Sequence, residues 1–163
     1  MRRSDHLKPL SWEHHDALKY AHRLRKGITN GTDPQILRNY LHVVVEQHLR
    51  PHFALEESAL ISRLSEQQRR HDAVQQVLKE HQQMLTLAEE IERQEDDITP
   101  LLNTFADRVK QHVKLEEIKL FPYLEETLTP EQLTAAKKEL ERGHKPGALS
   151  WDIPFWKSQA VSK

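Results

Sequence analysis

Residues 52–58 read HFALEES, and residues 112–122 read HVKLEEIKLFP. In each stretch a His is followed four positions later by a Glu, and both residues recur after a shift of 60 positions. Residues four positions apart lie on the same face of an α-helix, so each stretch points an imidazole and a carboxylate in one direction. The repeat predicts two equivalent helices that contribute the same pair of side chains to one site.

A second repeat lies upstream of the first. One apolar stripe at helical spacing contains His14, and a stripe shifted by 67 positions contains His81. The first stripe is Leu10, His14, Ala17, Leu18, Ala21 and Leu24, and the second is Val77, His81, Met84, Leu85, Ala88 and Ile91. The chain therefore reads as two αα-hairpin repeats, which predicts an all-α protein with an antiparallel four-helix up-down bundle.

Capping signals divide the chain further. Asp33–Pro34 and Thr99–Pro100 predict the starts of the second and fourth helices, because each pairs a capping side chain with a Pro at the first helical position. Thr129 and Gln132 predict a capping box that starts a short fifth helix, and Gly143 is expected to close it near residue 142. Pro51 and Pro122 lie inside helical runs, where we expect a kink or an interruption.

The expected organisation is one domain, with the bundle over residues 1–128 and a C-terminal helix and aromatic tail over residues 129–163. Trp151, Phe155 and Trp156 give the tail its apolar character. We expect an irregular tail that packs on the bundle, and a docking segment for another chain is the alternative. The oligomeric state and any protein partner stay open.

Composition excludes several classes of function. The chain has 163 residues, of which 37% are hydrophobic and 30% are charged, so it supports a single core. A net charge of −1 argues against nucleic acid or an anionic membrane as a partner. The sequence lacks an apolar run long enough for a membrane span or a signal peptide, and it has no Cys, so we expect a cytoplasmic protein whose strong metal ligands are His, Asp and Glu.

The repeated His and Glu side chains predict a dinuclear metal site. Either HxxxE pair alone is better explained as a core hydrogen bond or an exposed ion pair. Two carboxylates directed into one core would repel each other or take up protons, whereas two cations between them remove this cost. Imidazole nitrogens and carboxylate oxygens suit iron, with manganese or zinc as possible substitutes. The predicted ligands are His14, His52, Glu56, His81, His112 and Glu116.

These motifs resemble the hemerythrin-like, HHE cation-binding domains. The order His, HxxxE, His, HxxxE is complete over about residues 8–128, and HFxxEE and HxxxEExxLFP are typical of the family. The resemblance implies a four-helix bundle with a non-haem di-iron centre. It also implies that His14 and His52 hold one iron, that His81 and His112 hold the other, and that two glutamates bridge the irons. The bridging residues are Glu56 and Glu116.

The sequence departs from the oxygen-carrying members of that family. Val77 stands where those members have a further His, and Glu116 follows the last His by four positions instead of an Asp five positions after it. These differences put simple reversible oxygen carriage in doubt and favour open coordination positions for O₂, peroxide or nitric oxide. Glu57 and Glu117 are alternative ligands that the helical wheel disfavours. Ferritin-like bundles use paired ExxH motifs, and this chain has one, at Glu141.

Several other histidines need a separate assignment. His14 and His15 are adjacent, and the 67-residue repeat selects His14 as the ligand. His42 and Glu46 also form an HxxxE pair, but the wheel directs them to the flank of the helix or to solvent. His48 is expected to be a core histidine, with a hydrogen-bond donor or proton relay near the metals as the alternative. The histidines without a partner pattern are expected at the surface, namely His6, His22, His71 and His144.

Three classes of function follow. We favour a binding or sensing protein whose di-iron centre takes up O₂, nitric oxide or oxidant, or responds to iron. The alternative is a di-iron oxidoreductase acting on peroxide or O₂. In the third class the metal only stabilises the fold. Beyond the ligands, no side chain is assigned as a catalytic acid, base or nucleophile, so the sequence does not decide whether the protein is an enzyme.

Overall fold

The computed structural model describes residues 4–144, 147 and 149–157, and all regular secondary structure in this part of the chain is helical. The predicted all-α class is therefore confirmed. The elements in chain order are α1 (Lys8–Thr29), α2 (Pro34–Val44), η1 (Val45–Leu49), α3 (Arg50–Ala59), η2 (Ile61–Arg63), α4 (Glu66–Arg69), α5 (Asp72–Arg93), α6 (Thr99–Leu115), η3 (Glu116–Leu120), α7 (Phe121–Thr127) and α8 (Pro130–Gly143).

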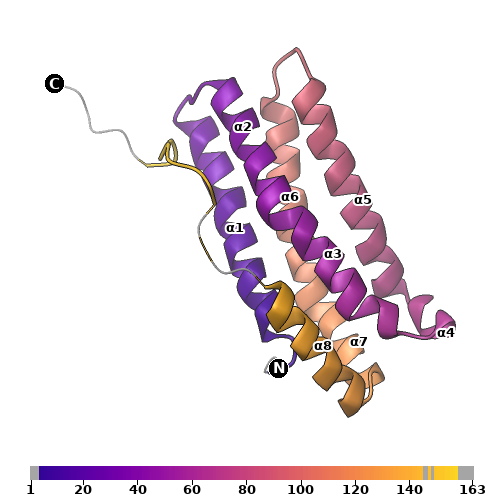
Figure 1. Ribbon diagram of the computed structural model, residues 1–163. Helices are drawn as coiled ribbons and strands as arrows, with labels where there is room; N and C mark the ends of the chain where they lie inside the picture. The colour runs from indigo at the N-terminus through magenta and orange to yellow at the C-terminus, as the bar shows by residue number, and fades with distance from the viewer. Residues whose placement is uncertain (1–3, 145–146, 148, 158–163) are drawn as a thin grey trace.

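Four long helical segments lie side by side (Figure 1). They are α1, the run α2–η1–α3, α5, and the run α6–η3–α7. Helix α6 packs along both α1 and α5, and α2 packs against α5 and α1. The two histidine stripes and the two HxxxE motifs thus lie on four neighbouring segments, which allows their side chains to meet between them.

Two of the predicted helix starts differ in their capping. The Asp33 carboxylate accepts a hydrogen bond from the backbone N–H of Gln35 at 2.8 Å, as expected of an N-cap. The cap predicted at Thr99 is wrong, because Thr99 is already helical and Ile98 is the N-cap residue. Asp97 instead accepts from the Thr99 N–H at 3.0 Å, so the capping side chain lies two residues before the helix.

The two long runs each contain one π-helical turn. In the turn η1 the N–H of Arg50 donates to the carbonyl of Val45, directly before Pro51. In the turn η3 the N–H of Phe121 donates to the carbonyl of Glu116, directly before a second Pro. Proline lacks an N–H for the α-helical ladder, so a wider turn at this point keeps the helix continuous. The predicted interruptions take this form, and both adjoin predicted ligands.

The apolar core forms two clusters with a polar layer between them. Leu10 and Val77 belong to one cluster, and Ala17 and Met84 belong to the other. His14 follows Leu10 by one turn and precedes Ala17 by one turn, and His81 has the same relation to Val77 and Met84. A layer of buried polar side chains therefore crosses the bundle where apolar packing would otherwise continue.

Helix α8 packs mainly against α3. It begins with the predicted capping box, in which the Thr129 hydroxyl accepts from the N–H of Gln132 at 3.1 Å. Gly143 ends the helix, but its φ is not positive, so it is not a left-handed cap. A Cβ at Gly143 would lie 2.6 Å from Cδ1 of Leu55, which shows that the glycine permits close packing on α3.

The described part of the aromatic tail packs on the bundle. The rings of Trp151 and Phe155 lie 5.1 and 4.9 Å from the ring of Tyr40 on α2. The guanidinium of Arg23 on α1 lies 4.0 Å above the ring of Trp156. These contacts support the packing interpretation over a docking segment. Residues 145, 146, 148 and 158–163 of the predicted tail lie outside the described residues.

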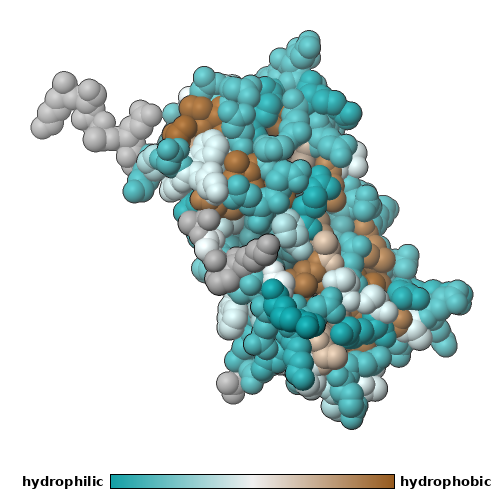
Figure 2. Space-filling model, viewed as in Figure 1, coloured by the Kyte–Doolittle hydropathy of each residue, from teal (hydrophilic) through white to brown (hydrophobic). Residues whose placement is uncertain are grey.

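On the face shown in Figure 2, hydrophilic side chains cover most of the helices. Over the described residues, no helix combines the length and the apolar composition that a membrane crossing would require.

Candidate metal centre

Six buried His and Glu side chains converge in the polar layer. One histidine comes from each of α1, α3, α5 and α6, and the two glutamates come from α3 and η3. None of the six exposes more than 4% of its surface. They are the six residues selected from the sequence, namely His14, His52, Glu56, His81, His112 and Glu116.

The six side chains form two groups that share both carboxylates. In the first group, one ligand atom each from His14, His52 and the two glutamates lie within 4.8 Å of one another. In the second group, His81 and His112 have the same relation to the same two glutamates. Each group offers two imidazole nitrogens and two carboxylate oxygens, which is a donor set for a divalent cation.

Polar atoms at the centre of this cluster lack well-formed hydrogen bonds, although Nε2 of His81 lies 3.2 Å from Oε1 of Glu56 and Nε2 of His112 lies 3.3 Å from Oε2 of Glu116. Among the described residues, the unsatisfied buried atoms include Nε2 of three imidazoles and three carboxylate oxygens. Leaving such atoms unsatisfied in a core costs free energy, and native proteins seldom do so without a bound ligand. The residues present therefore fit bound metal cations in this layer. The atoms are Nε2 of His52, His81 and His112, both Oε atoms of Glu56, and Oε2 of Glu116.

The two central carboxylates differ in electrostatics. Burial and the neighbouring charge of Glu116 raise the pKa of Glu56 to about 7. Burial acts in the same direction on Glu116, but the imidazole of His112 and hydrogen bonds from its neighbours hold the pKa of Glu116 well below its usual range. Two carboxylates this close favour a bound positive charge, either protons or metal ions.

The histidine pKa values are raised by the same carboxylates. Burial alone would lower the pKa of His52, but the carboxylates of Glu116 and Glu13 raise it to about 10. Burial is likewise outweighed at His81 and His112, whose pKa values rise to about 10 and about 9. The surrounding carboxylates therefore favour the protonated form of these imidazoles, and a metal ion would compete with the protons for the same nitrogens.

Each of the four histidines contacts a second carboxylate through its outer nitrogen. The contact fixes the orientation of each ring and leaves Nε2 directed into the cluster. In metalloproteins a carboxylate bonded to the outer nitrogen of a ligand histidine has the same effect. The Nδ1 to Oε distances are 2.6 Å for His14 and Glu117, 2.6 Å for His52 and Glu13, 2.7 Å for His81 and Glu57, and 2.8 Å for His112 and Glu80.

This outer shell of glutamates was not predicted from the sequence. Glu13 and Glu80 directly precede predicted ligands, and Glu57 and Glu117 directly follow them. A residue next to an inward-facing ligand points to the flank of its helix, where it reaches a histidine of the neighbouring helix. The repeated Glu-His and Glu-Glu pairs were the available signal. Glu57 and Glu117, weighed as alternative ligands, contact the outer Nδ1 atoms instead.

The remaining histidines lie outside the cluster. His15 is exposed, whereas His14 is buried. His48 lies 3.0 Å from the backbone carbonyl of Glu13 and stacks on His52, with ring centroids 6.1 Å apart. It therefore contacts the α1 backbone and an outer face of a predicted ligand. His42 is exposed on the helix flank, as the wheel predicted.

Two expected surface histidines have specific partners. His71 caps α5 and stacks on Tyr123, with ring centroids 3.8 Å apart. His144 lies 2.5 Å from the Glu13 carboxylate through Nδ1. His71 is exposed, as expected, and His144 is half-buried. Both contacts join residues from separate helical segments, so they depend on tertiary packing and leave no pattern in the sequence.

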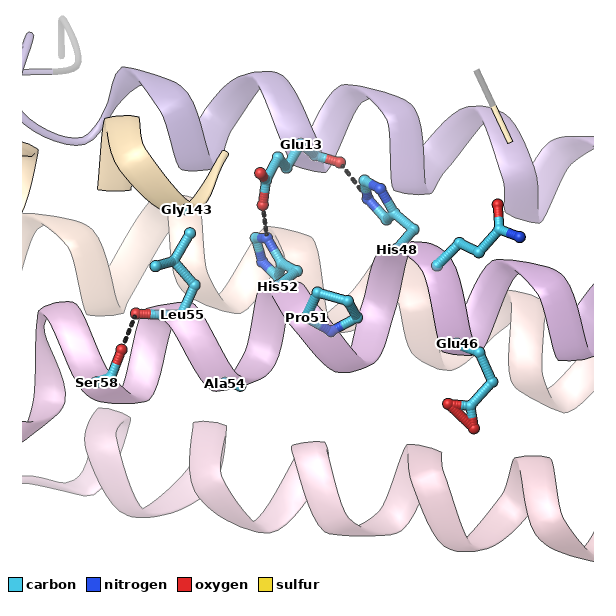
Figure 3. A pocket seen from close by; sticks show the side chains of 10 residues that line it. Glu13, Glu46, His48, Pro51, His52, Ala54, Leu55, Ser58 and Gly143 are labelled. Carbon is cyan, nitrogen blue, oxygen red and sulfur yellow. Dashed lines mark hydrogen bonds and ion pairs between the residues drawn. The ribbon is translucent and has the colours of Figure 1, made fainter. Parts of the chain in front are cut away.

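Two cavities adjoin the cluster. A small one of about 10 Å³ is bordered by the rings of His14, His52 and His112 and otherwise by apolar side chains. A larger one of about 590 Å³ lies outside the bundle core, along α3 and beside Glu13 and Gly143 (Figure 3). The small cavity adjoins three candidate ligands, whereas the larger one adjoins one of them, His52, together with Glu13 of the outer shell.

The chain matches a known family. A family model for the hemerythrin HHE cation binding domain matches residues 6–124, a segment that contains all six converging residues. No curated protein and no solved structure gives a significant match. The match confirms the resemblance inferred from the motifs. The chain therefore belongs to the hemerythrin HHE cation-binding domain family.

Proposed function

We propose that this chain is an antiparallel four-helix up-down bundle that holds two iron ions in a His/Glu dinuclear centre. His14 and His52 would hold one ion, His81 and His112 the other, and Glu56 and Glu116 both. The observation that carries the proposal is the set of unsatisfied Nε2 and Oε atoms in the two groups. Iron suits a mixed imidazole and carboxylate set, and manganese or zinc are possible substitutes.

We further propose that the centre binds or responds to a small ligand such as O₂, nitric oxide or peroxide. Bound iron would supply redox chemistry and an open coordination position. The cavity of about 10 Å³ beside three candidate ligands has room for about one water-sized molecule. Its apolar lining favours a small uncharged ligand, and its volume of about 10 Å³ argues against an organic substrate at this face. Val77, which replaces a family histidine, lies in the apolar core.

The second candidate function is a di-iron oxidoreductase acting on peroxide or O₂. Such a reaction consumes protons, which solvent would supply. The outer cavity of about 590 Å³ is lined by Glu13 and His48, next to the candidate ligand His52, and offers a route for them. We place the protein in the cytoplasm on the strength of its cysteine-free sequence.

Anaerobic loading with Fe(II) tests the metal centre. We expect two ions per chain by metal analysis, and fewer than two in a Glu56→Ala variant with an unchanged helical circular dichroism spectrum. One ion or none in the unaltered chain would contradict the dinuclear proposal.

Exposure of the loaded protein to each ligand separates the functional classes. Uptake of O₂ or nitric oxide, measured with an electrode and stoichiometric with the centre, supports binding or sensing. Steady turnover of peroxide that is lost in Glu56→Ala supports the oxidoreductase. Two bound metals without any ligand uptake would support a purely structural site instead.

A further inference from the structure

His144 connects the C-terminal helix to the metal centre. Its Nδ1 lies 2.5 Å from Oε2 of Glu13, and Oε1 of the same carboxylate lies 2.6 Å from Nδ1 of His52. The Nδ1–H groups of both imidazoles can donate to this carboxylate. His144 is the C-cap residue directly after α8, whereas Glu13 lies on α1 and His52 on α3. The family match covers residues 6–124, so His144 lies outside it. Two successive contacts through Glu13 thus link His144 to the candidate ligand His52.

The equivalent position in the other half of the repeat is built differently. Glu80 contacts His112 through Oε1, and its Oε2 accepts from Nε2 of Gln76 at 2.8 Å. Gln76 lies on the same helix as Glu80. The two halves of the repeat have the same candidate ligands. The outer carboxylate Glu13 contacts His144 at the end of α8, whereas Glu80 contacts Gln76 on its own helix.

The cavity beside Glu13 explains why a residue from outside α1 is needed to hold its carboxylate in place. The large cavity borders Glu13, so the carboxylate has room to turn away from His52 toward solvent (Figure 3). His144 blocks this movement from the end of α8. The position of that end is fixed by close packing, since a Cβ on Gly143 would lie 2.6 Å from a methyl group of Leu55.

We propose that His144 is a positioning residue for the metal centre. Acting through Glu13, it holds the imidazole of His52 so that Nε2 faces the cation shared with His14. The inference rests on the proposed dinuclear function. It implies that the two cation sites are not equivalent, because only the site of His14 and His52 depends on α8.

Competition with a chromophoric chelator tests the proposal, with Zn(II) as the probe. The unaltered chain should bind two Zn(II) ions, and His144→Ala should weaken one of them by about tenfold while the other keeps its affinity. His144→Gln retains a donor and should recover most of this loss. Arg142→Ala, an exposed change at the same end of α8, is the matched control and should have no effect.

A double-mutant cycle shows whether His144 acts through Glu13. In a Glu13→Ala background the effect of His144→Ala should disappear, whereas in a Glu80→Ala background it should persist in full. Equal weakening of both ions by His144→Ala, or no weakening of either, would overturn the positioning role. Failure of the unaltered chain to bind two Zn(II) ions would instead overturn the proposed dinuclear centre.

Discussion

The ring of Phe53 stacks on the imidazole of His81, with ring centroids 4.1 Å apart and planes 15° from parallel. The same ring lies edge-on to His112, with centroids 5.7 Å apart. Phe53 directly follows the candidate ligand His52, which belongs to the other group. Phe53 therefore packs against both histidines of the second group, whereas the adjacent His52 belongs to the first group.

Replacement of Phe53 should destabilise the protein even without metal. Phe53 exposes only 3% of its surface, so Phe53→Ala leaves a cavity beside His81 and should lower the free energy of unfolding by about 3–5 kcal/mol. Urea denaturation of chelator-treated protein measures this change. Ile118→Ala is the control, because Ile118 is 58% exposed and its removal should cost less than about 0.5 kcal/mol. Equal effects of the two changes would contradict the packing described.

The adjacent histidines of α1 should differ sharply in metal binding. His14 is buried, with Nε2 at 2.6 Å from Glu116, whereas His15 is exposed. We expect His14→Ala to lose at least one Fe(II) ion per chain and His15→Ala to keep two, by metal analysis after anaerobic loading. A greater loss in His15→Ala would contradict the assignment from the repeat.

The convergence of the six central side chains was predictable because it depends on helical periodicity. The 60-residue and 67-residue shifts each place a His on an inward stripe, and packing the four stripes with these residues at one height in the bundle brings the side chains together. The same periodicity predicted that His14, and not His15, faces the core, and that His42 lies at the flank of its helix. These inferences need only the direction of a side chain from its own helix.

The outer shell could not be predicted in the same way. The wheel shows that Glu13 and Glu57 point to a flank, but it does not show which neighbouring helix lies there. The contact of Glu13 with His144 spans 131 positions and depends on how α8 crosses the bundle. The cap before α6 differs for a local reason, because the Asp97 carboxylate accepts from the N–H of Thr99 two residues later, in place of the expected Thr99 cap.

Removal of an outer carboxylate should weaken metal binding without removing a ligand. Glu80 lies 2.8 Å from Nδ1 of His112, and Glu80→Ala leaves that ring free to turn. We expect a loss of about 10- to 100-fold in the affinity for one Zn(II) ion, by competition with a chromophoric chelator. Glu89→Ala, at an exposed position of the same helix, should leave both affinities unchanged. Equal affinities in the two variants would show that Glu80 does not orient His112.

The stabilisation by metal should increase with pH. In the apo protein the pKa values of His52 and His81 are raised to about 10 and that of His112 to about 9, above the ordinary value of 6.5. The stabilisation from these charged imidazoles is complete below pH 6.5 and is lost as the pH rises through the folded-state pKa values. Metal binding has the opposite dependence, because protons compete for the same nitrogens.

The difference in thermal midpoint between Zn(II)-loaded and chelator-treated protein should therefore grow from about pH 6.5 to about pH 8.5. Loading in weak buffer at neutral pH should also release protons, since at least these three imidazoles are charged before the metal binds. The variant His81→Ala removes one of them and should release fewer protons. A difference in midpoint that stays constant or shrinks with rising pH would mean that the imidazoles are not the groups that exchange protons for metal.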